Sequence, residues 1–260
     1  MKIFGRKYNF NELIIKIIDL SKMFFRSLIF KDFILLWIAY IRQNSPKSNM
    51  IITRDGYKIF LSKNPHDTIT VMVIFCRQEY GKIIPGSTII DVGANIGAFS
   101  MYAARCGAKK VYAFEPNKES FDVLSKNIKE NNLENTVIPY NLAVGPIDGE
   151  FISIPKESSP YNKTYGNLND QTNYDIVETI SLHTFINKND VKKIDFLKMD
   201  CEGAEYQIMY PLGTDDLKLI SNFRLENHDS HEKENLIAFL RKNGLMKTHE
   251  KHLIMWFERI

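Results

Sequence analysis

Residues 85–260 show a regular order of apolar runs and amphipathic stretches. Short runs rich in β-branched residues predict strands at 87–92, 110–115, 136–144, 177–182, 194–199 and 220–226, with a closing pair at 246–250 and 253–259. Apolar positions at helical spacing predict helices at 97–106, 118–131, 203–210 and 231–243. Because strands alternate with helices, we expect an α/β fold with a doubly wound, mostly parallel sheet.

Other segments interrupt this order. Residues 50–62 form two β-rich runs around Asp55-Gly56, which is a strong β-hairpin signal. Residues 68–76 are largely apolar, and their pattern is compatible with either a strand or a buried helix. Asp148-Gly149 predicts a second hairpin, and the polar residues 155–175 are typical of a lid or a disordered excursion.

The first fifty residues have the pattern of amphipathic helices. Apolar residues recur at helical spacing from Phe10 to Ile29, with charged residues largely opposite. The apolar run Phe33–Ile41 is much shorter than the roughly 20 residues that cross a bilayer. Two interpretations stay open: the helices bury their apolar face on the main domain, or they bind a membrane surface or a partner protein. We divide the chain into a helical extension at 1–48, a β-hairpin lead-in at 49–84 and a main domain at 85–260.

Composition and charge narrow the class of protein. With 44% hydrophobic and 25% charged residues the chain is globular, and its three widely spaced cysteines indicate free thiols in a reducing, cytoplasmic setting. Residues 1–50 hold nine basic and three acidic residues, a charge of +6, so the remaining 210 residues carry −3 of the total of +3. The body therefore lacks the basic footprint of a nucleic-acid binder, although the extension could supply one.

The string D-V-G-A-N-I-G at 91–97 ends a predicted strand and opens a helix. Its glycines let backbone N–H groups approach a ligand closely, and the string matches neither the dinucleotide pattern nor a P-loop. Glu115 ends the next strand, where a carboxylate can accept hydrogen bonds from both hydroxyls of a ribose. Alternatively, Asp91 only stabilises the turn and Glu115 only precedes a helix.

Acidic residues and a histidine follow two later strands. Asp200, Glu202 and Glu205 come directly after the strand at 194–199, at the sheet edge where ligands of open α/β sheets bind. His228 follows the strand at 220–226 and is a candidate general base, unless it is only a surface histidine in a polar loop.

Four strings together resemble the FkbM family of S-adenosylmethionine-dependent methyltransferases: D-V-G-A-N-I-G-A-F-S (91–100), V-Y-A-F-E-P (111–116), N-L-A-V-G (141–145) and D-F-L-K-M-D-C-E-G-A-E (195–205). The resemblance implies the class I Rossmann-like methyltransferase fold, with seven strands. It implies that the cofactor S-adenosyl-L-methionine contacts Asp91, Gly93, Ala94, Asn95, Gly97, Glu115, Asn141 and Ala143. It places Asp200, Glu202, Glu205 and His228 at the methyl-transfer site. His183 stands where the family usually has Asp, which leaves its role open.

The expected activity is O-methylation of a hydroxyl on a sugar, glycan or small molecule, with Asp200 or His228 as the base. Alternatives are an RNA methyltransferase and a non-catalytic cofactor-binding protein that docks on a membrane or partner through residues 1–48. We assign no metal ligands, but Asp200, Glu202 and Glu226 could together hold a divalent cation. We expect residues 155–175, with Tyr161 and Tyr165, to select the acceptor.

Overall fold

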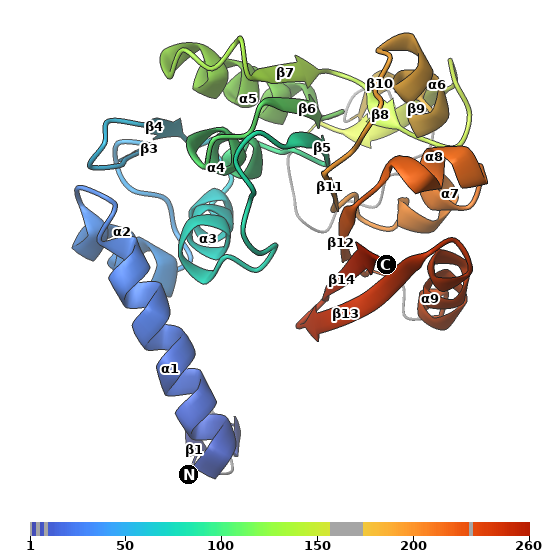
Figure 1. Cartoon of the computed structure of the whole chain (residues 1–260). Coiled ribbons are helices and arrows are strands. Elements are labelled where there is room, and N and C mark those ends of the chain that lie inside the picture. Colours follow the sequence, from blue (N-terminus) through green and yellow to red (C-terminus); the bar gives the residue numbers. More distant parts are fainter. Residues whose placement is uncertain (1, 4–5, 8–9, 157–173, 229–230) are drawn as a thin grey trace.

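A seven-stranded sheet forms the centre of the protein (Figure 1). The computed structural model describes residues 2–3, 6–7, 10–156, 174–228 and 231–260. The strands, in spatial order, are β13 (Leu245–Lys251), β14 (Ile254–Arg259), β12 (Asn222–Glu226), β11 (Phe196–Met199), β5 (Thr88–Val92), β6 (Lys110–Phe114) and β7 (Val137–Tyr140). The five from β12 to β7 run parallel, and β14 is antiparallel to both β12 and β13.

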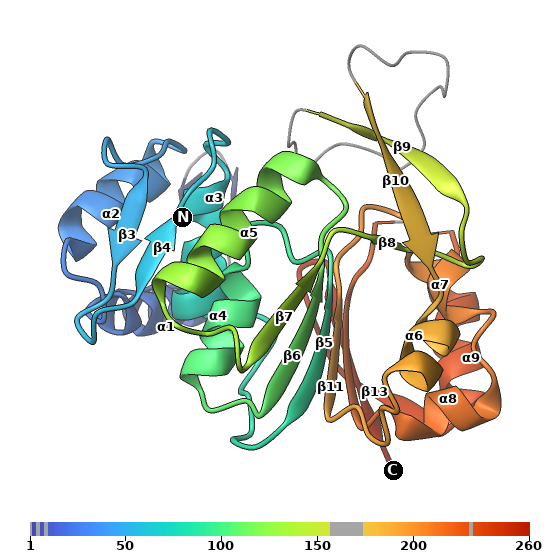
Figure 2. The ribbon, with the colours of Figure 1, turned by 90° about the horizontal axis from the view of Figure 1, so that it is seen from above.

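Helices cover both faces of this sheet, which confirms the predicted doubly wound α/β fold. In Figure 2, one face carries α4 (Ala98–Arg105) and α5 (Lys118–Glu130), and the other α6 (Leu182–Lys188), α7 (Glu205–Met209), α8 (Thr214–Leu219) and α9 (Lys233–Lys242). Strands covered on both faces are apolar at nearly every position, because both sets of side chains are buried. Ile89, Ile90 and Val92 of β5 are all buried, for example.

A second, smaller sheet lies beyond the carboxyl ends of the central strands (Figure 2). It consists of β8 (Ala143–Val144), β10 (Tyr174–Ile180) and β9 (Phe151–Pro155). The turn at Asp148-Gly149 joins β8 to β9, but both pair with β10, so the predicted hairpin is wrong. The strand predicted at 136–144 is also wrong, because it splits into β7 and β8 in different sheets. Most of the predicted 155–175 loop, including Tyr161 and Tyr165, lies outside the described residues.

The lead-in packs on the main sheet through α4 and α5. Its strands β3 (Met50–Ile52) and β4 (Lys58–Phe60) form the predicted hairpin. The side-chain amide of Asn127 on α5 accepts a hydrogen bond from Phe60 N–H and donates one to its carbonyl, as a neighbouring strand would. Residues 68–76 are helical rather than extended, since α3 (Asp67–Val71) continues into the π-helical turn η1 (Met72–Arg77).

The N-terminal extension consists of β1 (Lys2–Ile3), β2 (Arg6–Lys7), α1 (Phe10–Ser27) and α2 (Phe33–Ile41). In Figure 1, α1 projects from the body. Burial of the helices' apolar face on the main domain, the first interpretation above, holds only in part. Met23 of α1 and Leu36 of α2 are buried in the core, whereas Ile15 and Phe25 are 61% and 68% exposed. Across the described part of the chain, none of the helices combines the length and the apolar character needed to cross a bilayer.

Candidate active site

A cavity lies at the carboxyl ends of β5, β6 and β11, between the small sheet and the helical segment α3–η1. Two groups of side chains make its wall. Apolar residues include Ile69, Val73, Ile74, Val92, Phe99, Phe114, Leu142, Ala143, Val144 and Ile154. Polar groups include Asn64, His66, Tyr80, Asn95, Glu115, Asn117, Lys198, Asp200 and Glu202. An apolar wall with a few convergent polar groups is typical of a small-molecule site.

The glycine-rich turn after β5 forms one side of this cavity. Gly93 has φ +75° and Gly97 has φ +83°, values that favour glycine. A Cβ on Gly93 would collide with the main-chain oxygen of Asp200, and one on Gly97 with the Leu124 side chain. The glycines thus allow the turn to pack directly against the end of β11 and against α5. Gly93, Ala94 and Asn95 line the cavity, whereas Gly97 faces α5.

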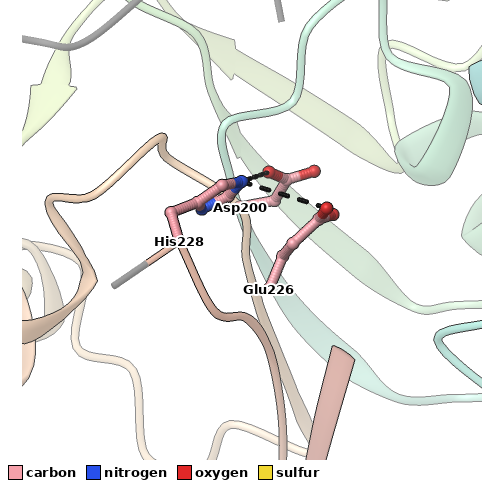
Figure 3. Close-up of side chains that lie close together, drawn as sticks. All are labelled: Asp200, Glu226 and His228. Atoms are coloured by element: carbon pink, nitrogen blue, oxygen red, sulfur yellow. Dashed lines mark ion pairs between the residues drawn. The ribbon is translucent and has the colours of Figure 1, made fainter. Parts of the chain in front are cut away.

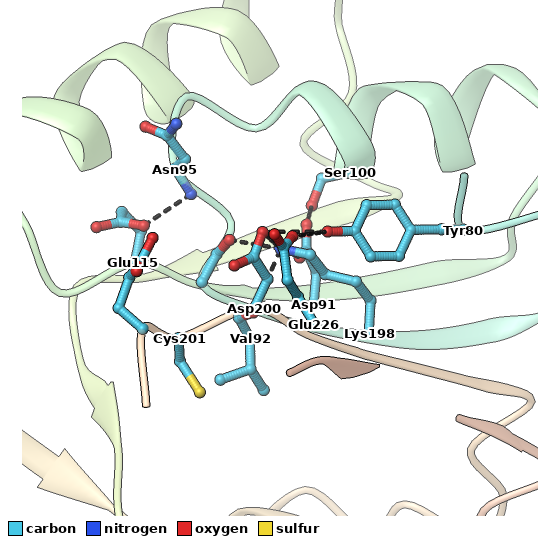
Figure 4. A network of polar contacts seen from close by, with 12 residues as sticks. Tyr80, Asp91, Val92, Asn95, Ser100, Glu115, Lys198, Asp200, Cys201 and Glu226 are labelled. Atoms are coloured by element: carbon cyan, nitrogen blue, oxygen red, sulfur yellow. Dashed lines mark hydrogen bonds and ion pairs between the residues drawn. The ribbon is translucent and has the colours of Figure 1, made fainter. Parts of the chain in front are cut away.

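Glu115 is a nearly buried carboxylate at the end of β6 (Figure 4). One of its oxygens accepts a hydrogen bond from Asn95 N–H at 2.7 Å and the other from Asn117 N–H at 2.8 Å. Burial raises the pKa of Glu115 to about 7, although these two hydrogen bonds favour the ionised form. The backbone therefore fixes both oxygens at the cavity wall, and each retains a further lone pair for a ligand hydroxyl.

Asp91 lies beneath the turn, where it is fully buried. It accepts a hydrogen bond from Ser100 Oγ at 2.7 Å and forms an ion pair with Lys198 Nζ at 3.2 Å. The same ammonium group donates a hydrogen bond to the Gly93 carbonyl at 2.6 Å. We did not single out Lys198 from the sequence. The sequence does carry a signal for this buried ion pair: Lys198 lies inside the apolar strand F-L-K-M, where a charged side chain needs a buried partner.

Asp200 points into the cavity together with Tyr80, which also went unpredicted. The Tyr80 hydroxyl donates to Asp200 Oδ2 at 3.1 Å and lies 3.3 Å from Glu226 Oε2 (Figure 4). Tyr80 precedes the recognisable strings and lies in a loop, so no periodicity or motif marks it. Glu202, whose backbone has a positive φ of 55°, projects from the turn that follows β11 and also lines the cavity.

His228 lies behind Asp200 and Glu202, and its orientation is set by Glu205. Its Nδ1 donates to the buried Glu205 carboxylate at 2.8 Å, and Nε2 lies 3.8 Å from Asp200 and 3.6 Å from Glu202. Burial alone would lower the pKa of His228, but the hydrogen bond to Glu205 and the surrounding carboxylates raise it to about 9. At neutral pH this imidazole is therefore a cation.

Three of these side chains also satisfy the spacing of a possible metal site. One ligand atom from each of Asp200, Glu226 and His228 lies within 4.8 Å of the other two (Figure 3). The cluster differs from the set considered from the sequence, because His228 takes the place of Glu202. A divalent cation would fit the chemistry of these donors, but all three already form ion pairs or hydrogen bonds with one another and with Tyr80.

The other sequence candidates have distinct positions. Ala143 lines the cavity. The side-chain amide of Asn141 donates to the carbonyls of Glu115 and Pro116, at 2.9 and 3.0 Å, so it holds the end of β6 in place. His183 is an exposed residue of α6 whose Nδ1 pairs with Asp216 of α8 at 2.8 Å.

The fold and this cavity define a Rossmann-like α/β protein with a ligand site at the carboxyl edge of its sheet. The family model for the methyltransferase FkbM domain matches residues 91–259. The chain therefore belongs to the FkbM methyltransferase family, which confirms the resemblance and the expectation of a methyltransferase.

Individual proteins are also similar to this chain. The hexuronic acid methyltransferase AglP of Haloferax volcanii is 28% identical over 220 residues, covering 80% of this chain and 86% of that protein. Methyltransferase 1 of Beauveria bassiana is 27% identical, covering 55% of this chain and 66% of its own length. Among solved structures, the METTL16 methyltransferase domain is 14% identical with a TM-score of 0.46, over 87% of this chain and 90% of that domain.

Proposed function

We propose that the cavity binds S-adenosyl-L-methionine and that the protein transfers its methyl group to a hydroxyl of a sugar-containing acceptor. The observation that carries the proposal is the Glu115 carboxylate, fixed by two backbone N–H groups beside the glycine turn. A rigid pair of acceptor oxygens at a strand end suits the two hydroxyls of a ribose. Gly93, Ala94 and Asn95 would lie along the methionine part, and Leu142, Ala143 and Val144 against the adenine.

The residues around Asp200 are suited to receive a proton from the acceptor. When bound, S-adenosylmethionine supplies a methyl group on a sulfonium that is already a good leaving group. An acceptor oxygen that forms a bond to this methyl group must lose its proton, and Asp200 lines the cavity where the proton can be taken. We assign the base to Asp200 rather than His228, because the raised pKa of His228 leaves it protonated at neutral pH. Glu202, on the same wall, would hydrogen-bond the acceptor.

A sugar acceptor is supported by the similarity to a hexuronic acid methyltransferase, and the negative charge of residues 51–260 does not favour RNA. A direct test of the sugar acceptor is to incubate the protein with S-adenosylmethionine and either a glucuronide or the matching glucoside. The readout is the formation of S-adenosylhomocysteine. Product with either sugar supports the proposal. Transfer to RNA but to neither sugar would contradict it.

Glu115→Gln tests the cofactor assignment. A Gln side chain has only one acceptor oxygen, so one backbone N–H would lose its acceptor and one ribose hydroxyl could no longer donate to the side chain. We expect the Kd for S-adenosylmethionine, measured by calorimetry, to rise by about tenfold to hundredfold. Glu119→Gln, on the exposed start of α5, is the matched control and should change nothing. Equal affinity of E115Q and wild type would show that the ribose does not bind here.

Cofactor affinity should also depend on pH. Because the pKa of Glu115 is about 7, the carboxylate is ionised above that pH and increasingly protonated below it. Only the ionised form accepts hydrogen bonds from both hydroxyls, so the affinity should be full at high pH and fall as pH decreases. We expect Kd to rise by about tenfold from one pH unit above this pKa to one unit below. In E115Q the same profile should be nearly flat.

A further inference from the structure

Helix α1 has its apolar side turned away from the protein body. Among the described residues of α1, seven apolar side chains are at least 39% exposed: Ile14, Ile15, Ile17, Ile18, Leu20, Phe24 and Phe25. Charged residues lie on the side that faces the body: Asp19 pairs with Lys251 at 2.7 Å, and Arg26 donates to the carbonyls of Cys76 and Arg77 on η1 at 3.0 and 3.2 Å. Helices that cover a protein core have the opposite arrangement.

Helix α2 extends this exposed surface. Ile34, Leu35, Ile38 and Ile41 are between 41% and 72% exposed. The two helices meet at an aromatic contact, where the ring of Phe24 lies 5.9 Å from that of Phe33 and 6.3 Å from that of Trp37. We call these eleven exposed side chains of α1 and α2 the N-terminal apolar surface. So many exposed apolar side chains on two adjoining helices are uncommon on a soluble monomer and mark a contact with another phase or molecule.

Basic side chains border the N-terminal apolar surface. Lys22, Lys31 and Arg42 are exposed, whereas Asp32 is the one exposed acid of the described residues 14–47. The excess of positive charge complements an anionic surface. A second copy of the chain, placed on the same surface, would instead bring like charges together.

We propose that the N-terminal apolar surface binds in the interface of a bilayer that contains anionic phospholipids. The apolar side chains would enter the upper acyl region while the lysines and Arg42 contact lipid phosphates. Helix α1 would lie flat on the bilayer, because Lys16, Asp19, Lys22 and Arg26 occur within its 18 residues. The segment lies outside the residues matched by the FkbM family model, so membrane binding would be an addition to the methyltransferase domain.

The position of α1 relates this surface to the cavity. Helix α1 is fixed to η1 by the two Arg26 hydrogen bonds and by the buried Met23. The same η1 segment supplies Val73 and Ile74 to the cavity wall. A bilayer bound at α1 would therefore hold the candidate active site at a fixed distance from the lipid surface.

Vesicle sedimentation of the full chain tests this proposal. The vesicles are phosphatidylcholine mixed with phosphatidylglycerol, or phosphatidylcholine alone. We expect wild type to sediment with the anionic vesicles, less at high salt, and at least tenfold more weakly with neutral ones. Ile15→Ser/Phe25→Ser should weaken binding to anionic vesicles by at least about tenfold, since both side chains would be buried in lipid. Lys22→Glu/Lys31→Glu should remove the preference for anionic vesicles.

The control is Ile84→Ser/Phe151→Ser, which removes an isoleucine and a phenylalanine of similar exposure, 68% and 63%, away from this surface. All variants change exposed side chains, and unchanged thermal unfolding would confirm that they fold. The control should bind like wild type. Failure of wild type to sediment with either vesicle would overturn the proposal, as would equal loss in the control. Self-association that I15S/F25S abolishes, without vesicle binding, would identify a second copy as the occupant. None of these measurements depends on cofactor binding or turnover.

Discussion

Replacing Lys198 with Met should lower the free energy of unfolding by about 3–5 kcal/mol, because it leaves a buried carboxylate without its cation. Lys198 and Asp91 have side chains that are 4% and 0% exposed, and the two charges lie 3.2 Å apart. Met fills a similar volume but offers no charge and no donor. The variant also loses the hydrogen bond from Nζ to the Gly93 carbonyl, which helps to hold the glycine turn. Urea unfolding followed by circular dichroism would measure the change.

Two further variants separate the buried pair from a general effect of losing a lysine. Lys193→Met removes an exposed ion pair with Asp195 and should cost less than about 1 kcal/mol. The double variant Asp91→Asn/Lys198→Met removes both charges and should recover much of the stability lost in K198M. If K198M were no less stable than K193M, Lys198 would not be the partner that keeps Asp91 buried.

The central sheet was predictable because its signal is local. The strands β5, β6 and β11 are short, mostly apolar runs with an acidic residue next to the carboxyl end, and each is followed by a helical period. Strand ends that share one edge then bring Asp91, Glu115 and Asp200 together, whatever the details of the loops. The small sheet was not predictable in this way, because β8 is only two residues long and finds its partner, β10, more than thirty residues later.

The cavity residues outside the strings depend on tertiary contacts. Tyr80 reaches Asp200 and Glu226 across 120 and 146 residues, and nothing in its own neighbourhood indicates that contact. His228 was identified by type, but the role of Glu205 in orienting it required the geometry. Amphipathicity predicted α1 correctly but left its packing open: periodicity identifies an apolar face, whereas only the packed body shows how much of that face is covered.

Asp200→Asn should reduce turnover by about 10²–10⁴-fold while leaving the affinity for S-adenosylmethionine nearly unchanged. Asn keeps the size of Asp and can still accept a hydrogen bond from Tyr80, but it cannot take a proton from the acceptor. Turnover is measured as S-adenosylhomocysteine released with the best sugar acceptor, and affinity by calorimetry. Asp190→Asn, at an exposed position away from the cavity, is the control.

Two readouts distinguish Asp200 as base from the other roles open to this cluster. If His228 were the base, turnover would rise with pH until its pKa of about 9 is passed, so a wild-type profile without this rise would exclude His228 as the base. If Asp200, Glu226 and His228 bound a divalent cation, EDTA would abolish turnover of the wild type and an added cation would restore it. The carboxylates of Asp200 and Glu226 and the imidazole of His228 lie in one cluster, so His228→Asn should also lower turnover. Retention of full turnover by both D200N and H228N would rule out this cluster as the site of proton removal.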